Sequence, residues 1–302
     1  MGLGTLSYEM YRKLNFRASV RLPAAKLMRN EERAERMLKT NAPAAPDIRG
    51  NVLLRSLLRT DAWLLVPHLS RVELHAGDRV SRSTGGSAQL FFPETVVFCV
   101  RHNLRADRQP ALGLIGHEGV VGWSLLMGLE RCTTQATVEM QGGTALSIPA
   151  LLLLGACAKS PTLRASLLRY ADNFLMQMAS TLGSNTTDAL ERRIARWILM
   201  LHDRSDGDTL MLTHDDVARA LHTRRASVTE CFHLLEGEHI LRCERARVTV
   251  RDRLRLEHIA GCAYGAVEAH YAADIAPWPN HVSTASPALS STGRASEDAA
   301  VL

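Results

Sequence analysis

The segment from Thr213 to Val250 constrains the fold most, because two short helical patterns stand only three residues apart within it. Thr213 is a favourable N-cap residue, and Asp215 and Asp216 fall in the first turn, where the helix dipole favours acidic side chains. A second helix is predicted from Arg225 to Glu236. The apolar residues that give each helix one buried face are Val217, Ala218, Leu221, Val228, Phe232 and Leu235.

The connection between these helices, His222 to Arg224, is so short that the helices must cross steeply, as in a helix-turn-helix. Ala218 supplies the small residue that is needed where the two helices touch. His222 stands where glycine usually allows a positive φ. Two short alternating runs follow, so the sequence predicts a helix-turn-helix with a two-stranded wing. The alternative interpretation is an ordinary αα-hairpin within a helical domain.

The composition is that of a globular chain, with 302 residues, 46% hydrophobic and 22% charged, and a formal net charge of +5. This length allows two domains, each with a sizeable core. The mildly basic balance permits binding to nucleic acid without demonstrating it. No apolar run approaches about 18 residues and the amino terminus has no secretory pattern. The sequence therefore predicts a cytoplasmic protein with no membrane partner.

Six cysteines are widely dispersed and form no CxxC pair, which argues against structural zinc and iron–sulfur sites. In a reducing compartment they are most simply buried small apolar residues, and a redox role for one of them is the alternative. We expect no metal site and no cofactor. The cysteines are Cys99, Cys132, Cys157, Cys231, Cys243 and Cys262.

Short strands separated by turns follow a helical stretch from Asn51 to Leu69, and they indicate a closed β-roll or sandwich. The candidate strands are Arg71–His75, Gln89–Phe92, Thr95–Arg101, Ala111–Ile115, Val120–Leu125, Gln135–Met140 and Thr144–Ile148. Residues 47–158 are the predicted roll domain. Residues 1–46 hold nine Lys or Arg against four Glu, and we interpret them as a loosely ordered basic extension.

Ser160 and Pro161 mark the start of a long helix, as an N-cap followed by proline at the first helical position. An apolar stripe with heptad spacing along this helix is typical of pairing with a second copy. The stripe is Leu168, Ala171, Leu175, Met178 and Leu182. The alternative is a helix buried within one subunit. Residues 159–186 are therefore the predicted dimerisation helix and hinge, and the polar run Gly183–Thr187 marks that hinge.

A further helix is predicted from about Asp188 to His202, where it would pack behind the helix-turn-helix. Residues 187–258 form the predicted winged domain. The segment from Arg253 to Ala263 is a short helix at best, and the chain after Tyr264 turns to Ala, Ser and Pro. We therefore expect residues 259–302 to be a disordered tail.

This order of a helix, a β-roll, a long heptad helix, a hinge and a winged helix-turn-helix resembles the Crp/Fnr family of bacterial transcription regulators, over roughly Asn51 to Asp252. The stretches that carry the resemblance are FFPETVVFCV, GLIGHEGVVG, ERRIARWILMLHDR, LTHDDVARAL, RRASVTECFHLLE and RVTVRDR. The last four together are specific.

The resemblance implies an α+β fold with an N-terminal β-roll sensor domain, similar to a double-stranded β-helix, a long dimerisation helix and a C-terminal winged helix-turn-helix. It also implies a homodimer that binds a palindromic operator in double-stranded DNA and contacts RNA polymerase.

The roll departs from the family members that bind cyclic nucleotides. Those members hold the ribose with a Gly-Glu pair and the cyclic phosphate with an Arg-Ser pair. Here Trp123 replaces the ribose-binding Glu, and Thr134 approximately replaces the phosphate-binding Arg. A buried phosphate without its arginine loses a charge-assisted partner, and the cysteine cluster of the oxygen sensors is absent too. We therefore expect a signal other than cyclic AMP.

The family contacts bases with residues early in the second helix, which here are Arg225, Ala226 and Glu230, with Ser227 and Thr229 as neighbours. Arginine can donate two hydrogen bonds to guanine and Glu230 could accept one from cytosine, although these two side chains could also pair with each other. Members that bind cyclic AMP have Glu and Arg in place of Ala226 and Glu230, so the target sequence should differ from theirs.

The other predicted DNA contacts lie before and after these positions. From Arg219 to Arg255 the chain holds nine arginines and five acidic residues, a net charge of +4, which suits contact with phosphates. Any of these arginines could instead be a surface ion-pair partner. The predicted contacts are Thr213, Arg224, Arg242, Arg245 and Arg247.

Two other classes of function compete with this interpretation. A cupin-like metalloenzyme could hold a metal through His68, His75, His102 or His117, but the paired-histidine spacing of cupins is missing, and no nucleophile elbow, GxGxxG or P-loop occurs. We therefore predict no catalytic residue and no enzyme. The second alternative is a signalling or interaction module whose winged domain no longer binds specific DNA. The thirteen Arg and thirteen acids from Asp188 to His258, a net charge of zero, and the presence of Ala226 keep that alternative open.

Overall fold

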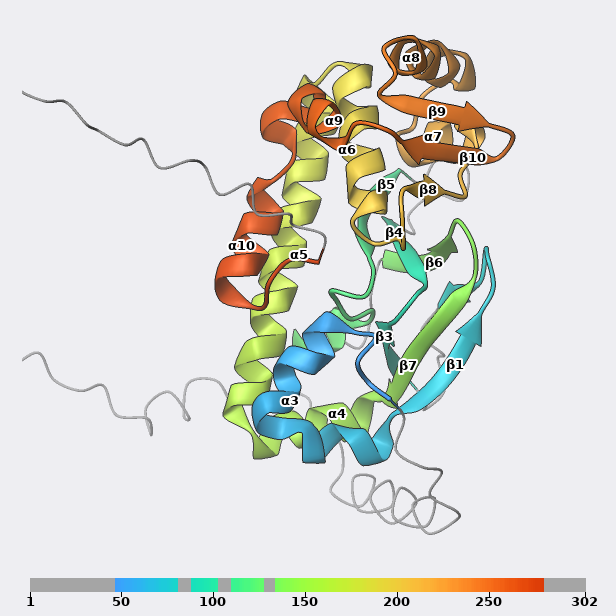
Figure 1. Cartoon of the computed structure of the whole chain (residues 1–302). Helices are drawn as coiled ribbons and strands as arrows, with labels where there is room; N and C mark the ends of the chain where they lie inside the picture. The colour runs from blue at the N-terminus through green and yellow to red at the C-terminus, as the bar shows by residue number, and fades with distance from the viewer. Residues whose placement is uncertain (1–46, 81–87, 103–109, 128–133, 280–302) are drawn as a thin grey trace, which may run out of the picture. The chain divides into compact units, whose positions relative to one another are not determined.

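The computed structural model describes residues 47–80, 88–102, 110–127 and 134–279 (Figure 1). The predicted extension at residues 1–46, Cys132, Thr133 and the last part of the predicted tail lie outside these residues. The predicted α+β fold with an N-terminal roll and a C-terminal helix-turn-helix is confirmed. Within the described residues, no helix is long and apolar enough to cross a membrane.

Two antiparallel sheets form the roll. One has the strand order β1-β7-β3 and the other the order β2-β6-β4-β5. The buried faces of the strands, with helices α3 to α5, enclose one apolar core. The elements are α3 (Val52–Leu65), a 3-10 turn (Val66–His68), β1 (Ser70–Leu74), β2 (Arg79–Val80), β3 (Gln89–Pro93), β4 (Val97–His102), β5 (Ala111–Ile115), β6 (Thr134–Glu139), β7 (Gly143–Pro149), α4 (Ala150–Lys159) and α5 (Pro161–Thr187).

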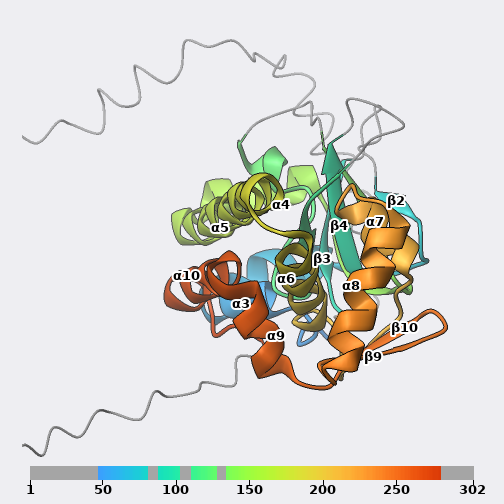
Figure 2. The ribbon, with the colours of Figure 1, turned by 90° about the horizontal axis from the view of Figure 1, so that it is seen from above.

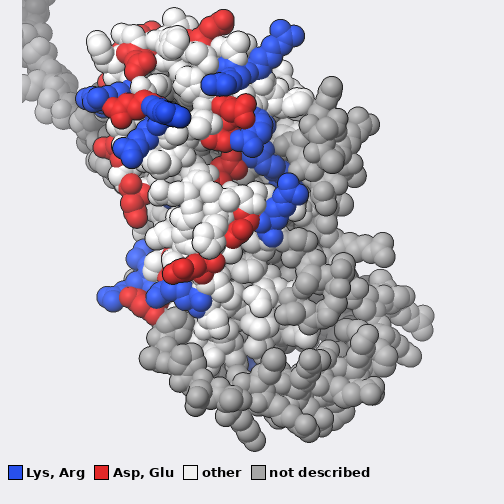
Figure 3. Space-filling view, turned by 90° about the vertical axis from the view of Figure 1, so that its right-hand side faces the viewer, with Lys and Arg blue, Asp and Glu red and all other residues white. Residues whose placement is uncertain are grey.

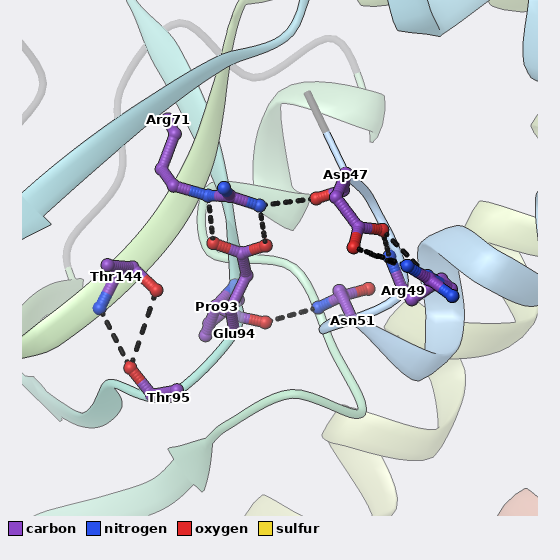
Figure 4. Close-up of polar contacts among 8 residues, drawn as sticks. All are labelled: Asp47, Arg49, Asn51, Arg71, Pro93, Glu94, Thr95 and Thr144. Atoms are coloured by element: carbon purple, nitrogen blue, oxygen red, sulfur yellow. Dashed lines mark hydrogen bonds and ion pairs between the residues drawn. The ribbon is translucent and has the colours of Figure 1, made fainter. Parts of the chain in front are cut away.

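The beginning of α3 is tied to the roll by polar contacts (Figure 4). The Asn51 amide donates to the carbonyls of Pro93, at 2.8 Å, and Gly119, at 3.0 Å. Beside it, the Arg71 guanidinium meets both carboxylate oxygens of Glu94 at 2.8 Å. Because Asn51 is fully buried, these bonds satisfy groups that water cannot reach.

The predicted strand Val120–Leu125 is wrong. Val121 makes only an isolated bridge to Phe91, and the chain then enters a 3-10 turn, Trp123–Met127. Gly122 has a φ of +96°, which turns the backbone out of the extended conformation. The helix α4 has no counterpart among the predicted elements, and it follows β7 directly. Pro149 is the residue before the first helical turn, where a missing N–H costs nothing.

The long helix begins as predicted, because the Ser160 hydroxyl accepts a hydrogen bond from the Leu163 N–H at 3.2 Å. The hinge prediction at Gly183–Thr187 is wrong. These residues are the last turn of α5, and the hydroxyls of Thr186 and Thr187 donate to the Gly183 carbonyl at 2.8 and 2.9 Å. Polar residues are thus satisfied within the helix, and the break falls at Asp188 and Ala189, both of which have extended backbone.

The winged domain contains α6 (Leu190–His202), β8 (Thr209–Leu210), α7 (His214–Ala220), α8 (Arg225–Gly237), β9 (Leu241–Glu244), β10 (Arg247–Val250) and α9 (Arg253–Ala260). The wing has a third strand, because β8 pairs with β10. A second apolar core lies here, and it includes Val97, Cys99, Ala111 and Leu114 of the roll. The outer face of the roll sheet therefore packs against the winged domain.

The predicted disordered tail is wrong as far as residue 279. After α9 come a 3-10 turn (Gly261–Ala263) and α10 (Ala266–Asp274), which lies alongside α5 (Figures 1 and 2). Val267, Tyr271 and Trp278 are buried there. Burial of these few large side chains stabilises the packing of the segment against the rest of the protein. The Ala-rich sequence around them gives no clear sign of a buried helix.

Candidate nucleic-acid interface

Helix α7 begins with the capping arrangement that its sequence predicts. The Asp216 N–H donates to the Thr213 hydroxyl at 3.2 Å, and the Thr213 N–H donates to the Asp216 carboxylate at 2.9 Å. The Thr213 hydroxyl also donates to that carboxylate at 2.6 Å. Two N–H groups at the helix start are thereby satisfied reciprocally. Thr213 is exposed but its hydroxyl is engaged within the cap.

The turn between α7 and α8 adopts the strained conformation that the sequence suggested. His222 has a φ of +51°, a region where glycine is favoured and histidine is tolerated. The next residue, Thr223, donates its N–H to the Ala218 carbonyl at 2.9 Å. Arg224 is then the N-cap of α8, without a side-chain cap bond. The turn therefore redirects the chain within three residues.

The two helices pack through small and apolar residues. Val217, Val228 and Phe232 are fully buried, and Ala218 is 6% exposed. Behind them lies Trp197 of α6, which is 1% exposed. This packing holds one face of α8 against α7 and α6. The other face of α8 lies on the outside of the protein, at the top of Figure 1.

The predicted base-contacting residues divide into two groups. Arg225, Ala226 and Glu230 are exposed, whereas Ser227 and Thr229 are half-buried. Arg225 and Glu230 do not form the ion pair that their spacing allowed, and Arg225 has no ion pair within the described part of the chain. Its guanidinium, at the N-terminal end of an exposed helix, is therefore available to a ligand.

The remaining predicted contacts are all exposed arginines, of which one is paired. Arg242 meets Glu244 at 2.8 Å, whereas Arg224, Arg245 and Arg247 make no ion pair with any described residue. Arg245 lies in the β9–β10 turn, where Ala246 has a φ of +56°, and Arg247 begins β10. The tip of the wing thus carries two unpaired cations.

Among the described residues on the face that Figure 3 presents, basic and acidic side chains are interspersed and form no broad surface of one sign. Several arginines of the winged domain are engaged internally: Arg219 with Asp215 and Asp216, Arg253 with Asp203, and Arg255 with Glu238. Positive charge that can reach a ligand is therefore concentrated at the start of α8 and the wing.

His214 is a site residue that sequence reasoning missed. Its Nδ1 lies 2.9 Å from the Thr229 hydroxyl, and its ring centroid lies 4.7 Å from that of Phe232. Burial and the nearby positive charges of Arg225 and His233 lower the pKa of His214. The available signal was its position four residues before Ala218, which places it on the face of α7 that meets α8.

The roll contains a cavity of about 50 Å³, lined in part by the residues that depart from the cyclic-nucleotide pattern. Gly122, Trp123, Ser124 and Thr134 contribute to its wall, and none of its described lining residues is charged. The Trp123 ring also lies 5.7 Å from Phe174 of α5, between centroids. The wall of the cavity therefore contacts the long helix directly.

The five residues of the predicted dimerisation stripe differ in how far the protomer itself buries them. Ala171 is fully buried within the protomer, and Leu168 and Met178 pack partly against the roll core. Leu175 and Leu182 are 42% and 67% exposed. Only these last two therefore present substantial apolar surface to a partner.

The histidines considered as metal ligands do not form a metal site. Among the described residues, no three His, Cys, Asp or Glu side chains are grouped as a bound ion would require. Cys99 and Cys157 are buried, Cys231 and Cys243 half-buried, and Cys262 exposed. Burial raises the pKa of Cys243 to about 11, which disfavours the reactive thiolate.

Residues 192–259 match the family of Crp-like helix-turn-helix domains. No curated protein matches the sequence. Among solved structures, a transcriptional regulator of the CRP family from Thermus thermophilus, TTHB099, is similar with a TM-score of 0.53 and 19% identity, over 65% of this chain and 99% of that one. FixK2 from Bradyrhizobium japonicum gives a TM-score of 0.54 and 14% identity, over 65% and 99%. A putative regulator of the crp/fnr family from Eubacterium rectale gives 0.53 and 16%, over 66% and 93%.

Proposed function

Because this chain has the fold of the Crp/Fnr transcription regulators and carries a Crp-like helix-turn-helix domain, we propose that it is a homodimer that binds specific double-stranded DNA. The family and the structural neighbours are regulators of transcription rather than enzymes. The observation that carries the proposal is Arg225, which is exposed at the start of α8 and makes no ion pair in the described chain.

In the proposed complex, the N-terminal part of α8 enters the major groove. A guanidinium there can donate two hydrogen bonds to O6 and N7 of guanine, and the Glu230 carboxylate can accept from a cytosine amino group. Arg224 and the wing arginines Arg245 and Arg247 contact phosphates, which position the domain without reading sequence. Arg242 contributes less, because Glu244 already neutralises it.

Dimerisation would use the exposed part of α5. Leu175 and Leu182 lie seven residues apart, on one face of the helix. Two copies related by a twofold axis would place two α8 helices in successive major grooves, so the operator should be palindromic. Contact with RNA polymerase belongs to the same proposal and rests on the family alone.

The roll would take a signal other than cyclic AMP. Its cavity of about 50 Å³ is bounded by apolar residues with Gln89, Ser124 and Thr134, and no charged residue lines the described wall. A phosphate placed there would lose its hydration without gaining a cationic partner. An uncharged and mainly apolar small molecule suits such a lining better.

The proposal is tested by selecting duplexes from a random DNA pool with the purified full chain. Arg225→Ala runs alongside, with Arg219→Ala as the matched control, because Arg219 is also exposed but is paired with Asp215 and Asp216. We expect a palindrome with half-sites about one helical turn apart. Arg225→Ala should lose or relax one base position in each half-site, and Arg219→Ala should keep it.

A different result would support the interaction-module alternative, which the interspersed charges of Figure 3 favour. In that case the wild type enriches no sequence, and its weak binding disappears at moderate salt. If the wild type and Arg225→Ala enrich the same motif, the protein binds specific DNA but Arg225 does not recognise a base.

A further inference from the structure

Three successive carbonyl groups in the β5–β6 connection each accept a hydrogen bond, two of them from the start of α3 and one from α10. The His117 carbonyl accepts from the Val52 N–H of α3 at 2.6 Å. The Glu118 carbonyl accepts from the Tyr271 hydroxyl of α10 at 2.7 Å, and the Gly119 carbonyl from the Asn51 amide at 3.0 Å. The turn 116–119 is therefore a junction between the roll, α3 and the C-terminal segment.

The side chain of Glu118 extends this junction into the winged domain. Its carboxylate meets the Arg204 guanidinium at 2.8 Å, and the two side chains are 3% and 0% exposed. Arg204 lies two residues after the last residue of α6 and also donates to the Met200 carbonyl at 2.7 Å. A Cβ at Gly116 would lie 2.8 Å from the Arg204 side chain, so glycine permits the close approach. Removing one partner of such a buried ion pair leaves the charge of the other partner buried and uncompensated.

The C-terminal segment covers this ion pair. The Trp278 ring lies 5.3 Å from the Arg204 guanidinium carbon, and Tyr271 packs edge-on against Trp278 with ring centroids 5.0 Å apart. Trp278 is 5% exposed and Tyr271 is fully buried. Water is thereby kept from the pair, which strengthens the attraction between its charges. This segment, residues 263–279, lies beyond the end of the matched helix-turn-helix family domain at residue 259.

The same segment contacts both sides of the break between α5 and α6. On α5, the Asn173 amide donates to the Val267 carbonyl at 2.9 Å. On α6, the Arg196 guanidinium donates to the Ala263 carbonyl at 2.8 Å. Because Asp188 and Ala189 lie between these helices, a bend at that point would have to break one of these two contacts.

The junction is also close to the roll cavity along the chain. Val121 and Trp123, which line the cavity, follow Glu118 by three and five residues. A ligand that displaced this wall would therefore act on the backbone that carries Glu118. In the segment 118–123, Glu118 therefore contacts the winged domain, and Trp123 lines the cavity.

We propose that residues 263–279 form a strap across the Asp188–Ala189 break, which holds the winged domain against the roll until movement of the turn 116–119 releases the Glu118–Arg204 pair. The strap itself follows from the contacts above. Its regulatory consequence rests on the proposed DNA-binding function, because it sets the orientation of α8 relative to the dimer helix.

The strap is tested by hydrogen exchange on the full chain and on Trp278→Ala. The amides to follow are Asp188 and Arg193, which bond to the Ser184 and Ala189 carbonyls at 3.0 and 3.2 Å. We expect both to exchange about tenfold faster or more in the variant, because the break opens locally. Trp63→Ala is the matched control, since Trp63 is 73% exposed on α3, and it should leave these amides unchanged.

A second, smaller substitution keeps the test decisive if Trp278→Ala unfolds the whole protein. Tyr271→Phe removes only the hydroxyl that bonds to the Glu118 carbonyl, and it should shift the same amides in the same direction by a smaller factor. Unchanged exchange at Asp188 and Arg193 in Trp278→Ala would overturn the strap. Equal acceleration in α8 and the roll strands would overturn it too, because the segment would then be ordinary core.

Regulation is tested with the duplex selected by the wild type. Trp278→Ala should change the affinity for it by about fivefold or more, the lower end of typical coupling between sites. A weaker complex would mean that the strapped orientation is the binding form, and a tighter complex that it is the inhibited form. Equal affinity would reject the regulatory role. If no duplex is ever selected, the proposed function fails while the exchange result still decides the strap.

Discussion

The Thr229 hydroxyl joins the two helices of the helix-turn-helix, because its oxygen lies 2.9 Å from Nδ1 of His214 on α7. The same hydroxyl donates to the Arg225 carbonyl one turn earlier on α8, at 3.0 Å. It therefore accepts from an Nδ1–H of His214, which sets the tautomer of the ring. The sequence predicts Thr229 as a neighbour of the base contacts, and these bonds give it a structural role behind Arg225.

Thr229→Ala should lower the free energy of unfolding by about 0.5–1.5 kcal/mol, the usual net value of a hydrogen bond. It should also weaken binding to every DNA sequence by a similar factor, because the helix is less well held while the base-contacting groups stay intact. Chemical denaturation and titrations with matched and mismatched duplexes measure the two effects. A changed base preference would show that Thr229 reads DNA itself.

His214 should make stability depend on pH. Its pKa in the folded chain lies below the ordinary 6.5, because of burial and the charges of Arg225 and His233, against a smaller opposing effect of Glu236. Below pH 6.5 the unfolded chain therefore binds more protons at this residue than the folded chain. The contribution of His214 is full above that pH and is lost as the pH falls through the window below it. Denaturation at several pH values should show the wild type losing more stability than His214→Gln on acidification, and parallel curves would refute this.

The wing arginines should set the salt dependence of DNA binding. Arg245→Ala and Arg247→Ala should each reduce the slope of log affinity against log salt by about one, because each removes an unpaired cation. Arg219→Ala is the control and should leave the slope nearly unchanged, since Asp215 and Asp216 already neutralise Arg219. Fluorescence titrations at several salt concentrations give these slopes. If Arg245→Ala and Arg247→Ala keep the slope of the wild type, as Arg219→Ala should, the wing lies away from DNA.

Leu182→Asp should dissociate the proposed homodimer without unfolding the protomer, because Leu182 is 67% exposed within it. Each interface residue occurs twice across a twofold axis, so we expect the dimer to weaken on the order of 100-fold. Sedimentation measures the association, and circular dichroism confirms the fold. Trp63→Asp, which changes another exposed apolar residue on α3, should remain dimeric. A dimer that tolerates both Leu182→Asp and Leu175→Asp would show that α5 is not the interface.

His222 should be sensitive to branching at Cβ rather than to loss of its imidazole. His222→Val should lower the free energy of unfolding by about 1–2 kcal/mol, because a β-branched residue is strained at positive φ. His222→Gly should be neutral or slightly stabilising, since relief of strain and the greater freedom of the unfolded chain oppose each other. Thermal and chemical denaturation compare the two. A larger loss with glycine would mean that the exposed His222 ring makes an important contact.

Much of the winged domain could be predicted from the sequence, because its signals are local. Thr213 and Asp216 form their capping box within one turn, and the spacing of Val217, Val228 and Phe232 reports which faces are buried. The positive φ of His222 falls at the turn position where glycine usually stands. A pattern of this kind needs no knowledge of distant residues.

The sequence failed where the deciding partner is far away along the chain. The heptad stripe of α5 shows that its residues are apolar, but the roll covers Ala171 and leaves Leu182 exposed. The polar run Gly183–Thr187 resembled a hinge because its local back-bonding could not be foreseen from composition. The strand predicted at Val120–Leu125 failed at Gly122, whose φ no apolar count reveals.

The sequence alone determined most of the elements and their order, and with them the resemblance to a known class of regulator. Only the tertiary structure brought Glu118 to Arg204, 86 residues later, and placed Tyr271 and Trp278 over them. Periodicity records that a side chain is buried, whereas the choice of its partner depends on how whole elements pack. Two buried charges are stable only together, so their pairing belongs to the folded chain and not to either segment.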